Sequence, residues 1–250
     1  SGSLAEKEKT MKSTKKDLLA IRKWVYRHFE SVDETDDKNL MRKGRRVVKD
    51  TLLKLPKEIW RKIQSGKHKI RFCLNIGIGG LSEHTCCIGP LNDNSYDIRL
   101  GETTLYNEEE IACCILAHEL AHAVSRQPCL YEAGKIPDDA TYDSYQIEAD
   151  RLASEWGFPI KKWLECEYKK REEFLHALRT PEFKTRLENE YNRMEKYKDY
   201  HDAKKREKDV KKQVENSIKQ AEEDGNYQLE DFRKRLMALG EEKKAKRSKA

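Results

Sequence analysis

The chain has 250 residues, of which 38% are charged, and its formal net charge is +6. No stretch approaches the roughly 20 consecutive apolar residues of a membrane span, and no segment reads as a secretory signal, so we expect neither a membrane protein nor a secreted one. The charge is uneven, because residues 71–160 hold 5 Lys/Arg against 15 Asp/Glu, whereas 1–70 hold 20 against 10 and 161–250 hold 26 against 20. This distribution predicts an acidic, apolar core region between two basic flanks.

The first flank, residues 1–68, is predicted to be helical. Apolar residues recur at helical spacing among lysines over 4–30, and a second, strongly basic helix is expected over about 38–55. Pro56 then opens a third, short helix, because proline is favoured in the first turn.

The central region, residues 69–160, is predicted to form the core. Asn107 is expected to cap a helix whose first turn holds three glutamates, which are favourable at the positive end of the helix dipole. Another helix is expected near 142–156. Three segments rich in apolar and β-branched residues predict a small three-stranded sheet, and they are 70–76, 84–88 and 95–100. Sheet and helices together predict an α+β fold.

The last flank, residues 161–250, is predicted to be a charged, extended helical region. Thr180 and Pro181 are typical of an N-cap followed by the first helical position. A thin apolar stripe over 182–222 then predicts one long helix with a solvated face, which Gly225 is expected to end. A final amphipathic helix and a basic tail complete the chain.

Cysteine usage favours free thiols. The chain has seven cysteines, and two adjacent pairs, Cys86-Cys87 and Cys113-Cys114, have a poor geometry for ordinary disulfides. No CxxC motif occurs. Buried thiols in a reducing compartment are therefore predicted, and with them a cytoplasmic location.

The segment His118-Glu119-Leu120-Ala121-His122 carries the chemistry. Two histidines at i and i+4 of a helix place both imidazoles on one face, where they can bind one Zn²⁺. Glu119 then projects beside the metal and can act as the general base towards a water molecule. A mid-helix position after candidate strands is the context that this HExxH motif requires.

About thirty residues downstream stands Glu148-Ala149-Asp150, followed by Ala153. Together with the HExxH segment, this motif resembles gluzincin-type zinc peptidases, and the ImmA/IrrE-like group most closely. The resemblance covers about residues 70–157. It implies a compact zincin core, Zn²⁺ as the cofactor, and a protein substrate, which in several members is a regulator of transcription.

The third zinc ligand is left open among three residues. In the family it is usually a Glu four residues before the Asp of this motif, and that position is Gln146 here. Asp150 shares a helix face with Gln146, whereas Glu148 points about 200° away from it. The small residues Ala149 and Ala153 mark the packed face and favour Asp150, but Glu148 is the only Glu in the motif. The resemblance itself implies that Asp150 orients a histidine.

Three further features each have two interpretations. His84, with the neighbouring Cys86 and Cys87, suggests either a second metal site or, as we prefer, a strand with buried thiols. Tyr142 and Tyr145 either donate to an oxyanion or, as we prefer, pack in the core. The strand at 95–100 is expected at a sheet edge, where an extended substrate can add as a further strand.

The motif predicts a zinc-dependent endopeptidase that cleaves a protein. The alternative is a catalytically weak zincin scaffold that binds a protein or nucleic acid through its basic helical arms. Basic residues at Arg42–Lys49 and Lys243–Lys249 keep nucleic-acid binding open. The stripe at 182–222 equally suits a partner helix, including that of a second copy.

Overall fold

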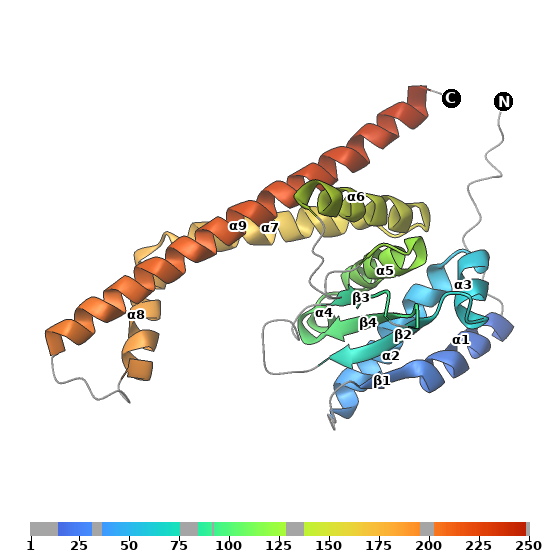
Figure 1. Cartoon of the computed structure of the whole chain (residues 1–250), viewed down its shortest axis with the longest axis horizontal. Helices are drawn as coiled ribbons and strands as arrows, with labels where there is room; N and C mark the ends of the chain where they lie inside the picture. Colours follow the sequence, from blue (N-terminus) through green and yellow to red (C-terminus); the bar gives the residue numbers. More distant parts are fainter. Residues whose placement is uncertain are drawn as a thin grey trace. The chain divides into compact units, whose positions relative to one another are not determined.

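The computed structural model describes residues 15–31, 37–75, 85–91, 93–128, 138–195 and 203–248, and it has the predicted α+β architecture (Figure 1). No helix in these ranges is long and apolar enough to cross a membrane. The helices are α1 (Lys15–His28), α2 (Lys38–Lys54), α3 (Lys57–Gln64), α4 (Glu102–Tyr106), α5 (Glu109–Ser125), α6 (Asp139–Glu155), α7 (Ile160–Leu178), α8 (Pro181–Glu195) and α9 (Ala203–Ser248). The strands are β1 (Phe29–Ser31), β2 (Ile70–Asn75), β3 (Cys86–Ile88) and β4 (Tyr96–Gly101).

The chain divides into two compact units, residues 1–163 and 164–250. The boundary therefore lies within α7, close to the predicted start of the last flank. Helices α1, α2 and α3 belong to the same unit as the sheet, because α1 and α2 pack on each other and α2 packs on both β2 and α5.

The sheet has four strands in the order β1-β2-β4-β3, not the three that were predicted. β1 pairs in parallel with β2, β2 pairs in parallel with β4, and β3 runs antiparallel to β4. The additional strand directly continues α1. Its three residues are too few to show the period-2 alternation by which a strand is recognised in a sequence.

The predicted edge strand is an interior one. β4 is hydrogen-bonded to β2 on one side and to β3 on the other, so β3 forms that edge of the sheet. The burial of the side chains along β4 is consistent with an interior strand. Tyr96, Ile98 and Leu100 are buried, and Asp97 and Arg99 between them are half-buried.

One face of the sheet carries the core. Phe72 and Leu74 of β2 lie on the same face as Ile98 and Leu100 of β4, and all four are buried. The helices α1, α2 and α5 contact the strands, and Trp24 of α1 meets the Phe72 ring edge-on. Burial of these side chains is the main force that holds α5 in place.

Helix α5 is buried along most of its length, with contacts to α2, α6, β3 and β4. Its start differs from the prediction, because Glu108 and not Asn107 is the N-cap residue. Residues 102–106 form the separate short helix α4, which Asn107 ends, and the Asn107 side-chain amide donates to the Thr103 carbonyl oxygen. Asn107 is thus a capping residue, but it caps the end of α4 and not the start of α5.

The described cysteines Cys73, Cys86, Cys87, Cys113, Cys114 and Cys166 are all free. Burial raises the pKa of both Cys73 and Cys114 to about 12, so both thiols stay protonated at neutral pH. Cys87 is buried and Cys86 half-buried, as expected of a strand that holds thiols. His84 and Cys129 lie outside the described residues.

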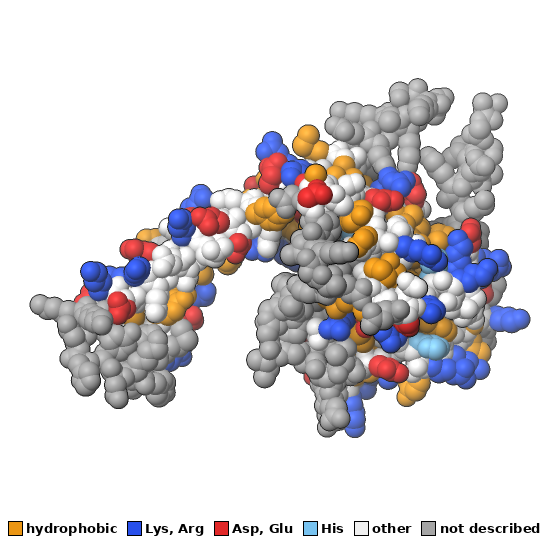
Figure 2. Space-filling view, in the orientation of Figure 1, with side chains coloured by type: hydrophobic (Ala, Val, Ile, Leu, Met, Phe, Trp, Pro, Cys, Tyr) orange, Lys and Arg blue, Asp and Glu red, His pale blue; other side chains and the backbone are white. Residues whose placement is uncertain are grey.

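In the second unit, α8 begins as the sequence predicts, since Pro181 is its first residue and the Thr180 hydroxyl accepts the Phe183 amide hydrogen. The single helix predicted over 182–222 is instead the pair α8 and α9, which pack on each other. Tyr191 of α8 and Ser217 of α9 are joined by a hydrogen bond of 2.7 Å between their hydroxyls. The stripe therefore has a partner within the chain. Lys/Arg and Asp/Glu side chains are intermixed along α9 (Figure 2).

Gly225 does not end a helix, because α9 continues through it to Ser248. A Cβ atom at position 225 would lie 2.6 Å from Cδ2 of Leu175 on α7, which is closer than real carbon atoms approach. A larger residue here would have to displace the Leu175 side chain, so close packing between the two helices favours glycine. A sequence pattern cannot distinguish such a glycine from a helix breaker.

Gly225 and Gly240 form a matched pair of α9 glycines for a stability test. A Cβ at Gly240 meets nothing within 4 Å, so Gly240→Ala should gain helix propensity and stabilise the fold by about 0.5–1 kcal/mol. Gly225→Ala makes the same change against Leu175, and overpacking should leave it about 1–3 kcal/mol less stable than Gly240→Ala. Chemical denaturation measures both. Equal effects of the two substitutions would contradict the packing role of Gly225.

Candidate metal centre

Helix α5 presents the two histidines of the motif side by side. His118 and His122 are 2% and 6% exposed, respectively, and their ring centroids lie 4.7 Å apart. The Trp163 ring lies 5.4 Å from the His118 ring, edge-on. Two histidines one helical turn apart in an otherwise apolar helix thus form a buried polar site.

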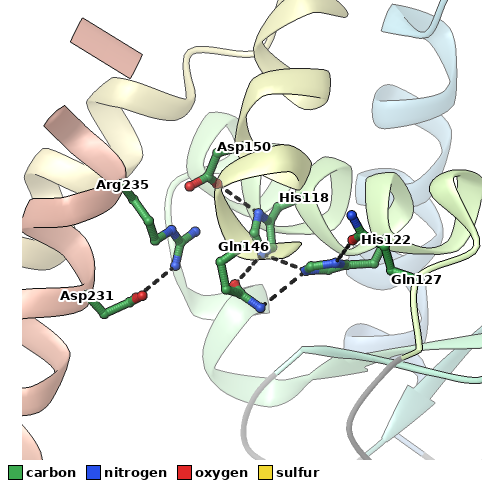
Figure 3. A network of polar contacts seen from close by, with 7 residues as sticks. All are labelled: His118, His122, Gln127, Gln146, Asp150, Asp231 and Arg235. Atoms are coloured by element: carbon green, nitrogen blue, oxygen red, sulfur yellow. Dashed lines mark hydrogen bonds and ion pairs between the residues drawn. The ribbon is translucent and has the colours of Figure 1, made fainter. Parts of the chain in front are cut away.

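Helix α6 supplies the opposite wall of the site. Asp138 caps this helix by accepting hydrogen bonds from the Thr141 amide and hydroxyl, both at 2.9 Å. Ala149 and Ala153 are fully buried, and such small side chains let α6 approach α5 closely. Gln146 and Asp150, one turn apart on α6, consequently face His118 and His122, one turn apart on α5 (Figure 3).

Asp150 fixes the orientation of His118. Its Oδ1 atom lies 2.8 Å from Nδ1 of His118, and the aspartate side chain is fully buried. A carboxylate only accepts hydrogen bonds, so Nδ1 carries the hydrogen and Nε2 of the neutral ring is left with a lone pair.

Gln127 fixes the orientation of His122. Its Nε2 atom donates to Oε2 of Glu148 at 2.7 Å, which identifies the other amide atom, Oε1, as the one that lies 2.6 Å from Nδ1 of His122. His122 therefore also carries its hydrogen on Nδ1. Glu148 thus reaches His122 through an amide, whereas Asp150 contacts His118 directly.

The end of α5 brings Gln127 to this position. Arg126 adopts a left-handed conformation with φ of 56°, and the next amide, that of Gln127, donates to the His122 carbonyl oxygen at 3.1 Å. The Arg126 amide donates to the Ala123 carbonyl oxygen, and these two bonds make a Schellman turn. Gln127 is thereby bonded to His122 twice, by its backbone and by its side chain.

The Nε2 atoms of the two histidines converge on a third donor atom. They lie 3.1 Å apart, and Oε1 of Gln146 lies 2.9 Å from Nε2 of His118. Gln146 Nε2 is 3.4 Å from His122 Nε2. With both hydrogens on the Nδ1 atoms, lone pairs face one another across this site. The Gln146 amide can donate to His122 Nε2, and a metal ion between the three residues would satisfy the remaining lone pairs.

These distances suit a metal ion. Four ligands at the usual zinc–nitrogen distance in tetrahedral geometry are separated by about 3.3 Å. His118 Nε2 lies 3.1 Å from His122 Nε2 and 2.9 Å from Gln146 Oε1. Two imidazoles suit zinc and other late first-row metals, while an amide oxygen is a weaker, neutral donor. The residues present therefore fit a metal, with a set of three uncharged protein donors.

Gln146, and neither acidic candidate, lies beside the Nε2 atoms. Asp150 contacts the far side of the His118 ring, and Glu148 contacts Gln127. Across the described ranges, no three His, Cys, Asp or Glu side chains gather at metal-binding distance. The third polar side chain at this point is therefore an amide and not a carboxylate.

Glu119 follows His118 directly on α5 and reaches the edge of the sheet. It is half-buried, and its Oε2 atom accepts the backbone amide hydrogen of Cys87 in β3 at 2.8 Å. The edge strand thus fixes the direction of this carboxylate. Tyr142 and Tyr145 are half-buried on α6, and an oxyanion role for either remains a prediction.

Sequence reasoning missed Gln127. The helix was expected to end at Gln127-Pro128, and the side chain of the residue that ends it was given no role. A polar residue directly after the last turn of a histidine-bearing helix is the available signal, because a Schellman turn folds that residue back onto the helix.

Comparison with known proteins adds no assignment: no protein-family model, curated protein or solved structure matches the chain. The interpretation of the site rests on its own geometry.

Replacement of Gln146 tests its role as the third donor. Gln146→Glu should tighten zinc binding by on the order of tenfold or more, because a carboxylate adds a negative charge and is a better zinc ligand. Gln146→Ala should weaken binding. Gln64→Glu, the same change on the exposed face of α3, is the control and should leave the affinity unchanged. Competition with a fluorescent chelator gives the affinities. Equal values for Gln146→Glu and wild type would remove Gln146 from the site.

The two hydrogen bonds that link Glu148 to Gln127 and Gln127 to His122 lead to a separate prediction. Gln127→Ala and Glu148→Ala should each weaken zinc binding by about 10–100-fold, the range seen when the group that orients a ligand is lost. The double substitution should cost little more than Gln127→Ala alone, because Glu148 acts through Gln127. Isothermal titration of zinc into the metal-free variants measures the coupling. Fully additive effects would show that the two residues act independently.

Proposed function

We propose that the protein is a zinc-dependent endopeptidase with a zincin-type core. The observation that carries this proposal is the convergence of the Nε2 atoms of two buried histidines, whose Nδ1 atoms are bonded to Asp150 and Gln127, on one point beside Gln146. His118, His122 and Gln146 would hold the metal ion. The sequence resemblance to gluzincin-type peptidases supports the same assignment.

Each residue of the site would have its own role in the reaction. Zinc bound there would polarise the scissile carbonyl and lower the pKa of a water molecule. Glu119 would take the proton of the attacking water and deliver it to the leaving amine. Asp150 and Gln127 keep the Nδ1 hydrogens in place, so that both Nε2 atoms point to the site. Each of these roles needs a buried, preorganised arrangement.

The proposed substrate is a protein segment in an extended conformation. β3 is the edge of the sheet, and Glu119 is hydrogen-bonded to it at Cys87. A peptide that adds to this edge would run past the carboxylate and the histidines. The sheet edge and the metal centre are therefore adjacent, as a peptidase needs.

A second candidate is a zincin scaffold that acts by binding. The neutral donor at Gln146 favours it, because two histidines and an amide hold zinc less firmly than two histidines and a carboxylate. In that case removal of the metal would leave the function of the protein intact.

Glu119→Gln separates these functions. The variant should bind zinc as the wild type does, because Glu119 is not among the converging donors, and the glutamine oxygen can still accept the Cys87 amide hydrogen. Peptidase activity should fall by on the order of 10²–10⁴-fold with loss of the general base. The measurement is cleavage of an unfolded protein, such as casein, with matched zinc content.

Glu58→Gln is the control, because Glu58 is exposed on α3, where it pairs with the surface residue Lys62. It should retain full activity. A zinc-loaded wild type that cleaves nothing in a broad peptide library would reject the peptidase, and retained activity in Glu119→Gln would reject the assigned base.

A further inference from the structure

A cavity of about 390 Å³ opens in the first unit, away from the candidate metal centre. Helices α1 and α2 form its walls. Val25 and Tyr26 of α1 provide its apolar part, and among the described residues no acidic side chain lines it. Six basic residues complete it, namely Arg22, Lys38, Arg42, Arg45, Arg46 and Lys49.

The basic residues form one stripe on α2. Positions 38, 42, 45, 46 and 49 are spaced three or four apart, so they share one helix face and project into one cavity. Like charges at this spacing repel and weaken a helix. The stripe is therefore an unfavourable arrangement for α2 alone, and a bound anion would relieve it.

Two of the six cations are paired with acidic groups. Lys49 lies 3.0 Å from Asp50, and Arg46 contacts both Asp50 and Glu109. The guanidinium of Arg45 stacks on the Tyr26 ring at 4.5 Å, and its buried Nε atom has no hydrogen-bond partner in the described part of the chain. A buried donor without an acceptor carries a desolvation cost that a ligand oxygen would remove.

Tyr26 gives the cavity an exposed aromatic face. Its side chain is 70% exposed at the cavity wall, although its ring is large and apolar. A ring beside several guanidinium groups suits a planar base whose attached phosphates reach the cations.

We propose that this cavity binds a nucleoside polyphosphate. The phosphates would lie among Arg22, Lys38, Arg42 and Arg45, and the base would stack on Tyr26. Guanidinium groups match phosphate oxygens in pairs of hydrogen bonds, which explains the choice of arginine at three of these four positions. The site is independent of the metal centre and of the peptidase proposal.

The size and shape of the cavity favour a small ligand over a nucleic acid. Its volume lies within the range of small-molecule pockets, roughly 300–1,000 Å³. The charges converge on this one hollow, whereas a nucleic-acid strand is followed by cations that continue along its backbone. A polyphosphate group carries several negative charges within a volume as small as that of this cavity.

Binding of ATP to the full chain tests the proposal. Titration calorimetry should show one site, with ATP bound more tightly than AMP because AMP has fewer charges. Arg42→Glu should weaken ATP binding at least about tenfold, as expected for loss of a charge-assisted contact. Arg61→Glu, the same change at an exposed arginine of α3 outside the cavity, should bind ATP as the wild type does. Circular dichroism verifies that both variants remain folded.

Substitutions of Tyr26 test the contribution of the base separately from that of the phosphates. Tyr26→Ala should weaken ATP binding by about tenfold while inorganic tripolyphosphate binds as before, and Tyr26→Phe should restore ATP binding. The proposal is overturned if ATP does not bind at millimolar concentration, or if Arg42→Glu and Arg61→Glu behave alike. It is also overturned if a single-stranded decanucleotide binds through these residues and ATP does not, since the surface would then serve nucleic acid.

Discussion

The hydrogen bonds on the Nδ1 atoms of His118 and His122 are the constraint on which the candidate site depends. Each imidazole has its hydrogen directed away from the other ring, towards Asp150 in one case and Gln127 in the other. What remains between the rings is two lone pairs 3.1 Å apart. A buried lone pair needs a hydrogen-bond donor or a metal ion as its partner, and Gln146 is the residue that lies beside both. The hydrogen bonds from Asp150 and Gln127 thus direct both Nε2 atoms to the same point, where they contact each other at 3.1 Å and where a metal ion could bind.

The rest of the first unit holds this pair of helices in register. Burial of α5 against α2, the sheet and α6 leaves it little freedom to rotate, and the alanines of α6 permit a close approach. A Schellman turn at the end of α5 and a capped start of α6 place Gln127 and Gln146 on opposite sides of His122. Helix α2 contributes to both the core and the basic cavity. One of its faces packs on α5, and another carries the charged stripe.

Local signals in the sequence predicted most of the helices, three of the strands and the face shared by the two histidines. They work because helix periodicity, proline and capping residues act within a few positions. Non-local features were not predictable in this way. Strand order placed 96–101 inside the sheet, and packing against Leu175 kept Gly225 within a helix. The sequence reduced the third donor to three residues of one helix, and only the packing of α5 on α6 distinguishes Gln146 from Asp150 and Glu148.

Both outer strands of the sheet, β1 and β3, are only three residues long. Short edges give another polypeptide few backbone groups to pair with, which protects a sheet from aggregation. At β3 the amide of Cys87 is already bonded to Glu119. Glu119 thereby occupies one of the few backbone donors of this edge, so any chain that pairs with β3 there, a substrate included, must displace its carboxylate from the Cys87 amide. Glu119→Ala would leave the Cys87 amide without this acceptor and make the edge more open to self-association, whereas Glu119→Gln keeps the acceptor.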